Sequence, residues 1–142
     1  MNAGGHKPQV FISHSSTDTW VAKQIAAHIK QCGAEFFLDA EDIEHGDDFE
    51  KKILEAAQAS SELLVLITPW ATLRPYIWLE MGVFWGSGKR IVGVLHGITA
   101  KEIASDERIP ILLKRIDLLD INRIDSYFDQ LRARLKDKQV SS

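Results

Sequence analysis

The sequence predicts an α/β fold: a flavodoxin-like, doubly wound sheet of five parallel strands in the order 2-1-3-4-5, with helices on both faces. Two observations carry this prediction. Five short apolar segments alternate with segments of helical periodicity, as in a series of β-α-β units. The apolar segments do not alternate strictly with polar residues, which is typical of strands buried on both faces of a parallel sheet.

The strands are expected where Val, Ile, Leu or Phe cluster: Gln9–Ser13, Glu35–Leu38, Leu63–Thr68, Arg90–Leu95 and Ile116–Leu119. Ligands of such sheets bind outside the carboxyl ends of the strands, at the point where the strand order reverses. That point lies between the first and third strands. The crevice is therefore expected at residues 13–18 and 68–80.

Helices are expected between the strands, from Thr17 or Asp18 to Gly33, at Asp48–Ala59, from Pro75 to about Trp85, around Lys101–Ser105, and at Ser126–Lys136. The first would bury Val21, Ile25, His28 and Ile29, which recur at helical spacing. Trp78 and Trp85 are expected in the core. Gly82 and Gly86, four residues apart, would let their helix approach the sheet or a neighbouring element closely.

Composition predicts one well-buried domain covering 1–142, with a core at about 9–136, since 45% of the 142 residues are hydrophobic and 26% charged. The formal charge of −3 gives no attraction to nucleic acid or to an anionic membrane. No apolar run approaches the ~18 residues of a membrane span. Cys32 is the only cysteine, so no internal disulfide is expected and a cytoplasmic location fits.

Glu80 is the main candidate for chemistry, because it is the one carboxylate in the otherwise apolar helix that begins at Pro75. Burying an unpaired carboxylate costs several kcal/mol, so an isolated acid in an apolar cleft is a functional candidate. Two structural alternatives remain open at this point. Glu80 could be exposed, or it could pair with Arg74 or Lys89.

The loop Ser13–Asp18 could meet a phosphate or sugar through its small hydrogen-bonding side chains, aided by the following helix N-terminus. Ordinary helix capping explains the same residue types. The segment Asp39–Asp48 is rich in acids and could cover a site, or simply form a solvated loop before the next helix. It lacks the spacing of a calcium loop, so no metal is expected.

Three stretches resemble TIR (Toll/interleukin-1 receptor) domains. Val10–Ser15 resembles the first conserved box, Phe37–Phe49 the second box with its BB loop, and Leu63–Pro69 the strand before the helix that holds the family's catalytic glutamate. The resemblance runs from about Gln9 to Leu135 in the family's order and spacing. Where the family commonly has Trp four residues before the glutamate, this chain has Tyr76.

The resemblance to the bacterial, NAD-cleaving TIR domains implies an NAD glycohydrolase that releases nicotinamide with ADP-ribose or a cyclic ADP-ribose. NAD would be the substrate, with no separate cofactor. It implies Glu80 as the catalytic residue and, around the substrate, Ser13, His14, Ser15, Asp39, Glu44, Gly46 and Tyr76. It also implies activation by TIR–TIR self-association, a separate sensor or effector protein, and a role in bacterial immune defence against phage.

Two other functions remain open. A non-enzymatic TIR scaffold would act by homotypic association alone. A nucleoside deoxyribosyltransferase-like enzyme would share the fold and a glutamate, but the match to the second box argues against it.

Overall fold

The computed structural model describes residues 7–38, 49–73, 75–111 and 113–141. It has the five-stranded parallel sheet that the sequence predicts, in the order β2-β1-β3-β4-β5. The strands are β1 Gln9–Ser13, β2 Glu35–Leu38, β3 Glu62–Ile67, β4 Arg90–Leu95 and β5 Asp117–Asp120. β3 and β5 are each displaced by one residue from their expected bounds.

The main helices are α1 Thr19–Cys32, α3 Phe49–Ala59, α4 Pro75–Gly86, α5 Ala100–Ser105 and α6 Ile124–Ser141. Three short 3-10 helices accompany them: η2 Ser16–Asp18, η3 Ala71–Leu73 and η4 Ile121–Arg123. α1 ends at Gly33, whose φ of 102° is the left-handed conformation that glycine adopts without strain. α6 is longer than expected at both ends. In the described part of the chain, no helix is long and apolar enough to cross a membrane.

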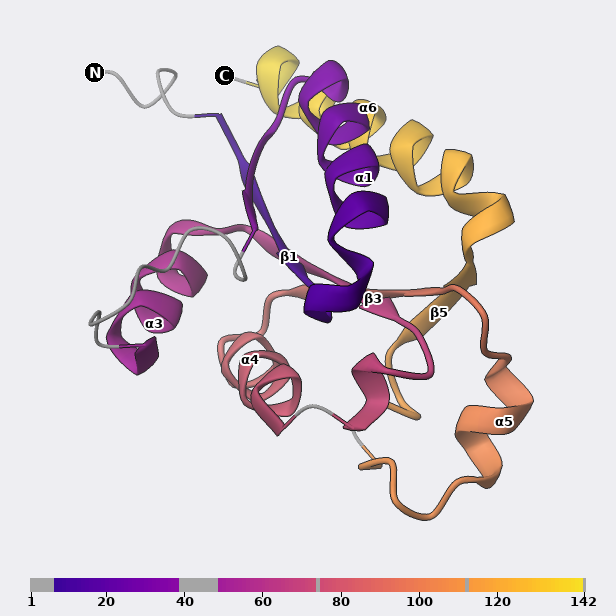
Figure 1. The fold of residues 1–142 in the computed structure, drawn as a ribbon. Coiled ribbons are helices and arrows are strands. Elements are labelled where there is room, and N and C mark those ends of the chain that lie inside the picture. The colour runs from indigo at the N-terminus through magenta and orange to yellow at the C-terminus, as the bar shows by residue number, and fades with distance from the viewer. Residues whose placement is uncertain (1–6, 39–48, 74, 112, 142) are drawn as a thin grey trace.

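Two layers of helices enclose the sheet, with α1 and α6 on one face and α3, α4 and α5 on the other (Figure 1). The two-residue period of β3 divides its side chains between these layers. Leu64 and Leu66 pack toward α1 and α6, whereas Leu63, Val65 and Ile67 pack toward α3 and α4. Every residue of β3 is buried, which explains the unbroken apolar run that follows Glu62.

The buried face of α1 differs from the expected one at His28 and, in part, at Val21, which is only half-buried. Ile25 and Ile29 are buried as predicted, together with Ala22 and Ala26. The prediction for His28 was wrong. Its side chain is exposed and stacks on the ring of Phe128 in α6, with 5.1 Å between ring centroids.

A buried polar cluster stands at the amino end of β3. The carboxylate of Glu62 accepts a hydrogen bond of 2.6 Å from the Tyr127 hydroxyl and two, of 2.8 and 2.9 Å, from Nη2 of Arg134. Both partners lie on α6, so the cluster joins this helix to the central strand. It lies at the end of β3 opposite to the predicted crevice.

Candidate functional site

β1 directs Ser13 toward α4. Phe11 packs into the core on the α3 and α4 side, and Ser13, two residues later, projects from the same face of the strand. Ser13 is fully buried and pairs in register with Val65 of β3. Its hydroxyl therefore lies at the carboxyl end of the sheet, between the strands where the order reverses.

α4 presents Glu80 to the sheet. Ile77, Met81 and Phe84 lie on the buried side of the helix, at the three- and four-residue spacing of one helical face. Glu80 falls on that side, and its Oε1 accepts a hydrogen bond of 2.7 Å from the Ser13 hydroxyl. The fold thus joins two predicted site residues that are 67 positions apart in the sequence.

Glu80 is 0% exposed, so the interpretation as a surface glutamate is wrong. Pairing with Lys89 is wrong as well, because the Lys89 ammonium donates to the main-chain oxygens of Ala57 and Ser60, each at 2.7 Å. The other proposed partner, Arg74, lies outside the described residues. Because the carboxyl group has no solvent-accessible surface, a substrate reaches it only after neighbouring side chains move.

His14 and Ser15 continue from β1 and are both fully buried. Nδ1 of His14 lies 2.9 Å from the main-chain oxygen of Ser15. Since a carbonyl oxygen only accepts, Nδ1 carries the proton in this contact. The Ser15 hydroxyl accepts from the amide of Thr17 at 3.4 Å, so part of this loop performs the capping that the sequence left open.

Asp18 and Thr68 form a link across the crevice that the sequence did not reveal. Asp18 precedes α1, yet its side chain makes no capping hydrogen bond to that helix. Its Oδ2 instead accepts from the Thr68 hydroxyl at 2.7 Å, and both residues are buried. Thr68 Oγ1 also accepts from the amide of Ala71 at 3.2 Å, which ties the start of η3 to the same link. The sequence signal that could have revealed this link is Thr68 itself, a polar residue directly after the apolar strand β3.

The remaining predicted site residues divide into two groups. Tyr76 is partly buried and packs against the same core cluster as Phe84. Asp39, Glu44 and Gly46 lie outside the described residues. The fold therefore brings together Ser13 and Glu80, and His14 and Ser15 follow Ser13 directly in the chain.

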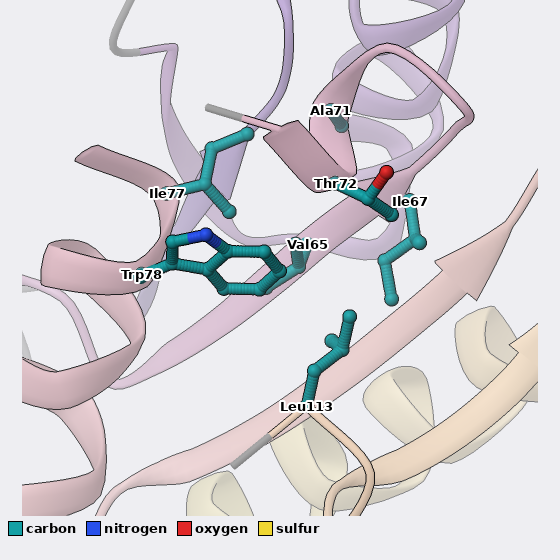
Figure 2. A pocket seen from close by; sticks show the side chains of 7 residues that line it. All are labelled: Val65, Ile67, Ala71, Thr72, Ile77, Trp78 and Leu113. Carbon is teal, nitrogen blue, oxygen red and sulfur yellow. The ribbon is translucent and has the colours of Figure 1, made fainter. Parts of the chain in front are cut away.

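A small apolar hollow lies near these residues but does not include them. It is too small to hold a water molecule and is lined by Val65, Ile67, Ala71, Thr72, Ile77, Trp78 and Leu113 (Figure 2). Trp78 reaches over it from α4 and packs against the core, but it is only partly buried, so the expectation that it lies in the core is met in part. Neither Ser13 nor Glu80 lines the hollow, so it is not the candidate site.

Comparison with known proteins agrees with this architecture. A family model described as "TIR domain" matches residues 10–136. No curated protein matches the chain. Among solved structures, the TIR domain of the Toll-related receptor TRR-2 from Hydra magnipapillata superposes with a TM-score of 0.66 at 18% identity, covering 89% of this chain and 97% of that one.

Two further solved structures share the fold. A TIR-STING receptor from C. gigas in complex with 2',3'-cGAMP has a TM-score of 0.66 at 17% identity, over 89% of this chain and 40% of that one. A 2-desoxiribosyltransferase from Leishmania mexicana also has a TM-score of 0.66, at 12% identity, over 86% of this chain and 97% of that one. At such identities the likeness concerns the fold alone.

Proposed function

This chain belongs to the TIR domain family, and we propose that it is an NAD glycohydrolase with Glu80 as its catalytic carboxylate. TIR domains include NAD-cleaving enzymes as well as adaptors. One observation carries the proposal for this chain. The buried carboxylate of Glu80, the one charged group of the apolar helix α4, lies at the carboxyl end of the parallel sheet. It accepts a hydrogen bond of 2.7 Å from the Ser13 hydroxyl. Buried carboxylates placed in this way are functional candidates.

The proposed reaction breaks the bond between ribose C1′ and the nicotinamide nitrogen. The bonding electron pair leaves with nicotinamide, which departs neutral because it was a pyridinium. Water then adds to C1′ and releases a proton, giving ADP-ribose. Attack by an adenine nitrogen in place of water would give a cyclic ADP-ribose.

One carboxylate suffices for this chemistry. O-glycosidases use a second acid to protonate a poor leaving group, whereas a neutral pyridine needs no proton. Glu80 would orient the ribose hydroxyls and stabilise the positive charge that develops on the sugar. Ser13 would hold the Glu80 carboxylate in place. His14, Ser15 and Tyr76, with Asp39, Glu44 and Gly46, would contribute to binding NAD.

The burial of Glu80 bears on how the enzyme would be activated. With the carboxyl group 0% exposed, the isolated chain is expected to turn over slowly. Association with further copies, or with a separate sensor protein, would stabilise an arrangement that is open to NAD. The setting we propose is immune defence in the bacterial cytoplasm. There, phage infection would trigger either the depletion of NAD or the formation of a cyclic ADP-ribose signal.

The test is mass spectrometry of NAD incubated with concentrated protein, with and without a crowding agent. Wild type should release nicotinamide, and the partner product separates ADP-ribose from a cyclic form. Glu80→Gln keeps the size of the side chain and an acceptor for Ser13 but removes the charge. We expect this variant to be slower by about 100-fold or more, on the scale of a lost transition-state electrostatic contact.

Glu55→Gln is the matched control, since Glu55 is an exposed carboxylate on α3. It should leave nicotinamide release unchanged, and circular dichroism should show that all variants are folded. Wild-type protein that is folded and assembled, yet releases no nicotinamide, would refute the proposal. Equal activity in wild type and Glu80→Gln would refute the role of Glu80.

A non-enzymatic scaffold is the second candidate, favoured by the complete burial of Glu80. Under that function Glu80→Gln would change stability or association, and no protein sample would consume NAD. The fold shared with the 2-desoxiribosyltransferase also calls for a parallel incubation with deoxynucleosides. Release of free base from these, with NAD left intact, would replace the proposed substrate.

A further inference from the structure

Two hydrogen bonds join the same two segments across the crevice. One segment is residues 13–18, between β1 and α1, and the other comprises Thr68, η3 and α4. The Ser13 hydroxyl donates to Glu80 at 2.7 Å, and the Thr68 hydroxyl donates to Asp18 at 2.7 Å. The first segment is therefore attached to the second at both of its ends.

The residues between these two attachments are packed without access to solvent. His14 and Ser15 are both 0% exposed, as is Glu80. The Thr68 hydroxyl also accepts from the amide of Ala71 at 3.2 Å, so the start of η3 is held by the same group that holds Asp18. With both hydrogen bonds in place, the crevice has no room for a substrate at the Glu80 carboxyl group.

α4 is packed on its inner side but open on its outer side. Leu79 is 48% exposed and Trp85 is 50% exposed, so the expectation that Trp85 lies in the core was wrong. No described atom lies within 4 Å of where a Cβ would stand on Gly82 or Gly86. Both glycines point away from the sheet, and their expected close approach to it was wrong as well. The described part of the chain thus leaves space for η3 and α4 to shift outward.

We propose that the Asp18–Thr68 hydrogen bond is an autoinhibitory latch, which holds the crevice closed over Ser13 and Glu80 until it is released. Of the two hydrogen bonds, this is the one that can open without loss of the proposed chemistry. Opening between Ser13 and Glu80 would free the carboxylate that must stay in position. Opening between Asp18 and Thr68 frees the other end of the first segment and the start of η3, while Ser13 still holds Glu80.

The latch lies directly beneath the surface. Asp18 is 6% exposed, and its chain neighbour Thr17 is exposed. Thr68 is 0% exposed, and Pro69 after it is exposed. A small displacement therefore brings water to both groups, and water replaces the hydrogen bond that each one loses. The open state leaves no charged group buried and unpaired, which keeps the two states close enough in free energy to act as a switch.

The net strength of one hydrogen bond to a carboxylate sets the expected effect. Loss of such a bond changes the ratio of closed to open protein by about 10- to 100-fold. While the open form is the minor one, the rate of any process that needs it rises by the same factor. Both the cleavage of NAD and the chemical modification of His14 are processes of this kind.

The activity test rests on the proposed function. Thr68→Val keeps the shape of the side chain and removes the hydroxyl. At a low micromolar concentration without a crowding agent, this variant should release nicotinamide about tenfold faster than wild type, or more. Thr68→Ser restores a hydroxyl and should return the rate toward the wild-type value.

A second measurement needs no NAD and so tests the latch separately from the proposed function. Diethyl pyrocarbonate modifies accessible imidazoles, and mass spectrometry locates the product. Modification of buried His14 should be about tenfold faster in Thr68→Val than in wild type, because it follows the population of the open form. His28 is exposed and should react equally in both proteins. Asp18→Asn keeps an oxygen acceptor without the charge, and a smaller increase is expected there; it also serves if Thr68→Val does not fold.

Tyr127→Phe is the matched control. It too removes a hydroxyl that donates to a buried carboxylate, at 2.6 Å, but at the opposite end of β3. Well below its Tm, this variant should leave both the modification of His14 and the release of nicotinamide at their wild-type rates. An equal increase in Tyr127→Phe would show a general loosening of the domain and would overturn the latch.

The remaining outcomes separate the two proposals. Modification of His14 at the wild-type rate in folded Thr68→Val and Asp18→Asn would overturn the latch, whatever their activity. Faster modification without faster NAD cleavage, in protein that does cleave NAD, would overturn its autoinhibitory role. Faster modification in protein that never cleaves NAD would support closure by Asp18 and Thr68 and refute the proposed function instead.

Discussion

Replacing Tyr127 with Phe should destabilise the domain by about 2 kcal/mol at neutral pH. The hydroxyl of Tyr127 donates to the buried Glu62 carboxylate at 2.6 Å, and a hydrogen bond to a charged group contributes about 1.5–3 kcal/mol. Phe keeps the aromatic ring of this residue, which is only 3% exposed. Glu62 also keeps its contacts to Arg134 at 2.8 and 2.9 Å, so the loss should not exceed this range.

The same variant has a distinctive pH dependence. Burial, and then the negative charge of Glu62, raise the pKa of Tyr127 well above its ordinary value of 10.0. Because the pKa of Tyr127 is higher in the folded than in the unfolded chain, its contribution to stability is fully present at any pH below the pKa of the unfolded chain. Above about pH 10 the unfolded chain loses a proton that the folded chain retains, so this stability falls by about 1.4 kcal/mol per pH unit.

Urea unfolding of wild type and Tyr127→Phe, from about pH 7 to about pH 11, measures both effects. The stability difference between the two proteins should be constant at neutral pH and should narrow above about pH 10. Other alkaline titrations occur in both proteins and cancel in the difference. A double-mutant cycle with Glu62→Gln isolates the pair. A difference near zero at neutral pH, or one that does not narrow at high pH, would refute the reasoning.

Two further predictions concern packing and thiol chemistry. Gly93→Ala should cost about 1–3 kcal/mol in urea unfolding, because a Cβ on this β4 residue would lie 2.7 Å from Cδ1 of Ile67 and 2.8 Å from Cδ2 of Leu118; an unchanged midpoint would contradict it. Burial raises the pKa of the Cys32 thiol above its usual 9.0. Alkylation of Cys32 at about pH 8 should therefore be slower in the folded protein than in protein unfolded by urea. Equal alkylation rates in the two states would contradict this expectation.

Local patterns in the sequence were sufficient for much of the fold. β1, β2 and β4 have their predicted bounds, because short apolar runs between turn residues mark strands directly. Gly33 ends α1 as expected, since a positive φ at a helix end is a local property of the backbone. His28 and Trp85 were misjudged, because periodicity locates a helix but does not say which side chains a neighbouring element covers.

For the candidate site, the sequence by itself determined that Glu80 is unusual, since it is the one charged residue in an apolar helix. Only the tertiary structure decided that its partner is Ser13, because the pairing of β1 with β3 brings the two together. The Asp18–Thr68 link depends on the same pairing. The tertiary structure also decided that Gly82 points away from the sheet. Residue spacing defines which positions share a helix face, but only packing against the sheet decides which face is buried.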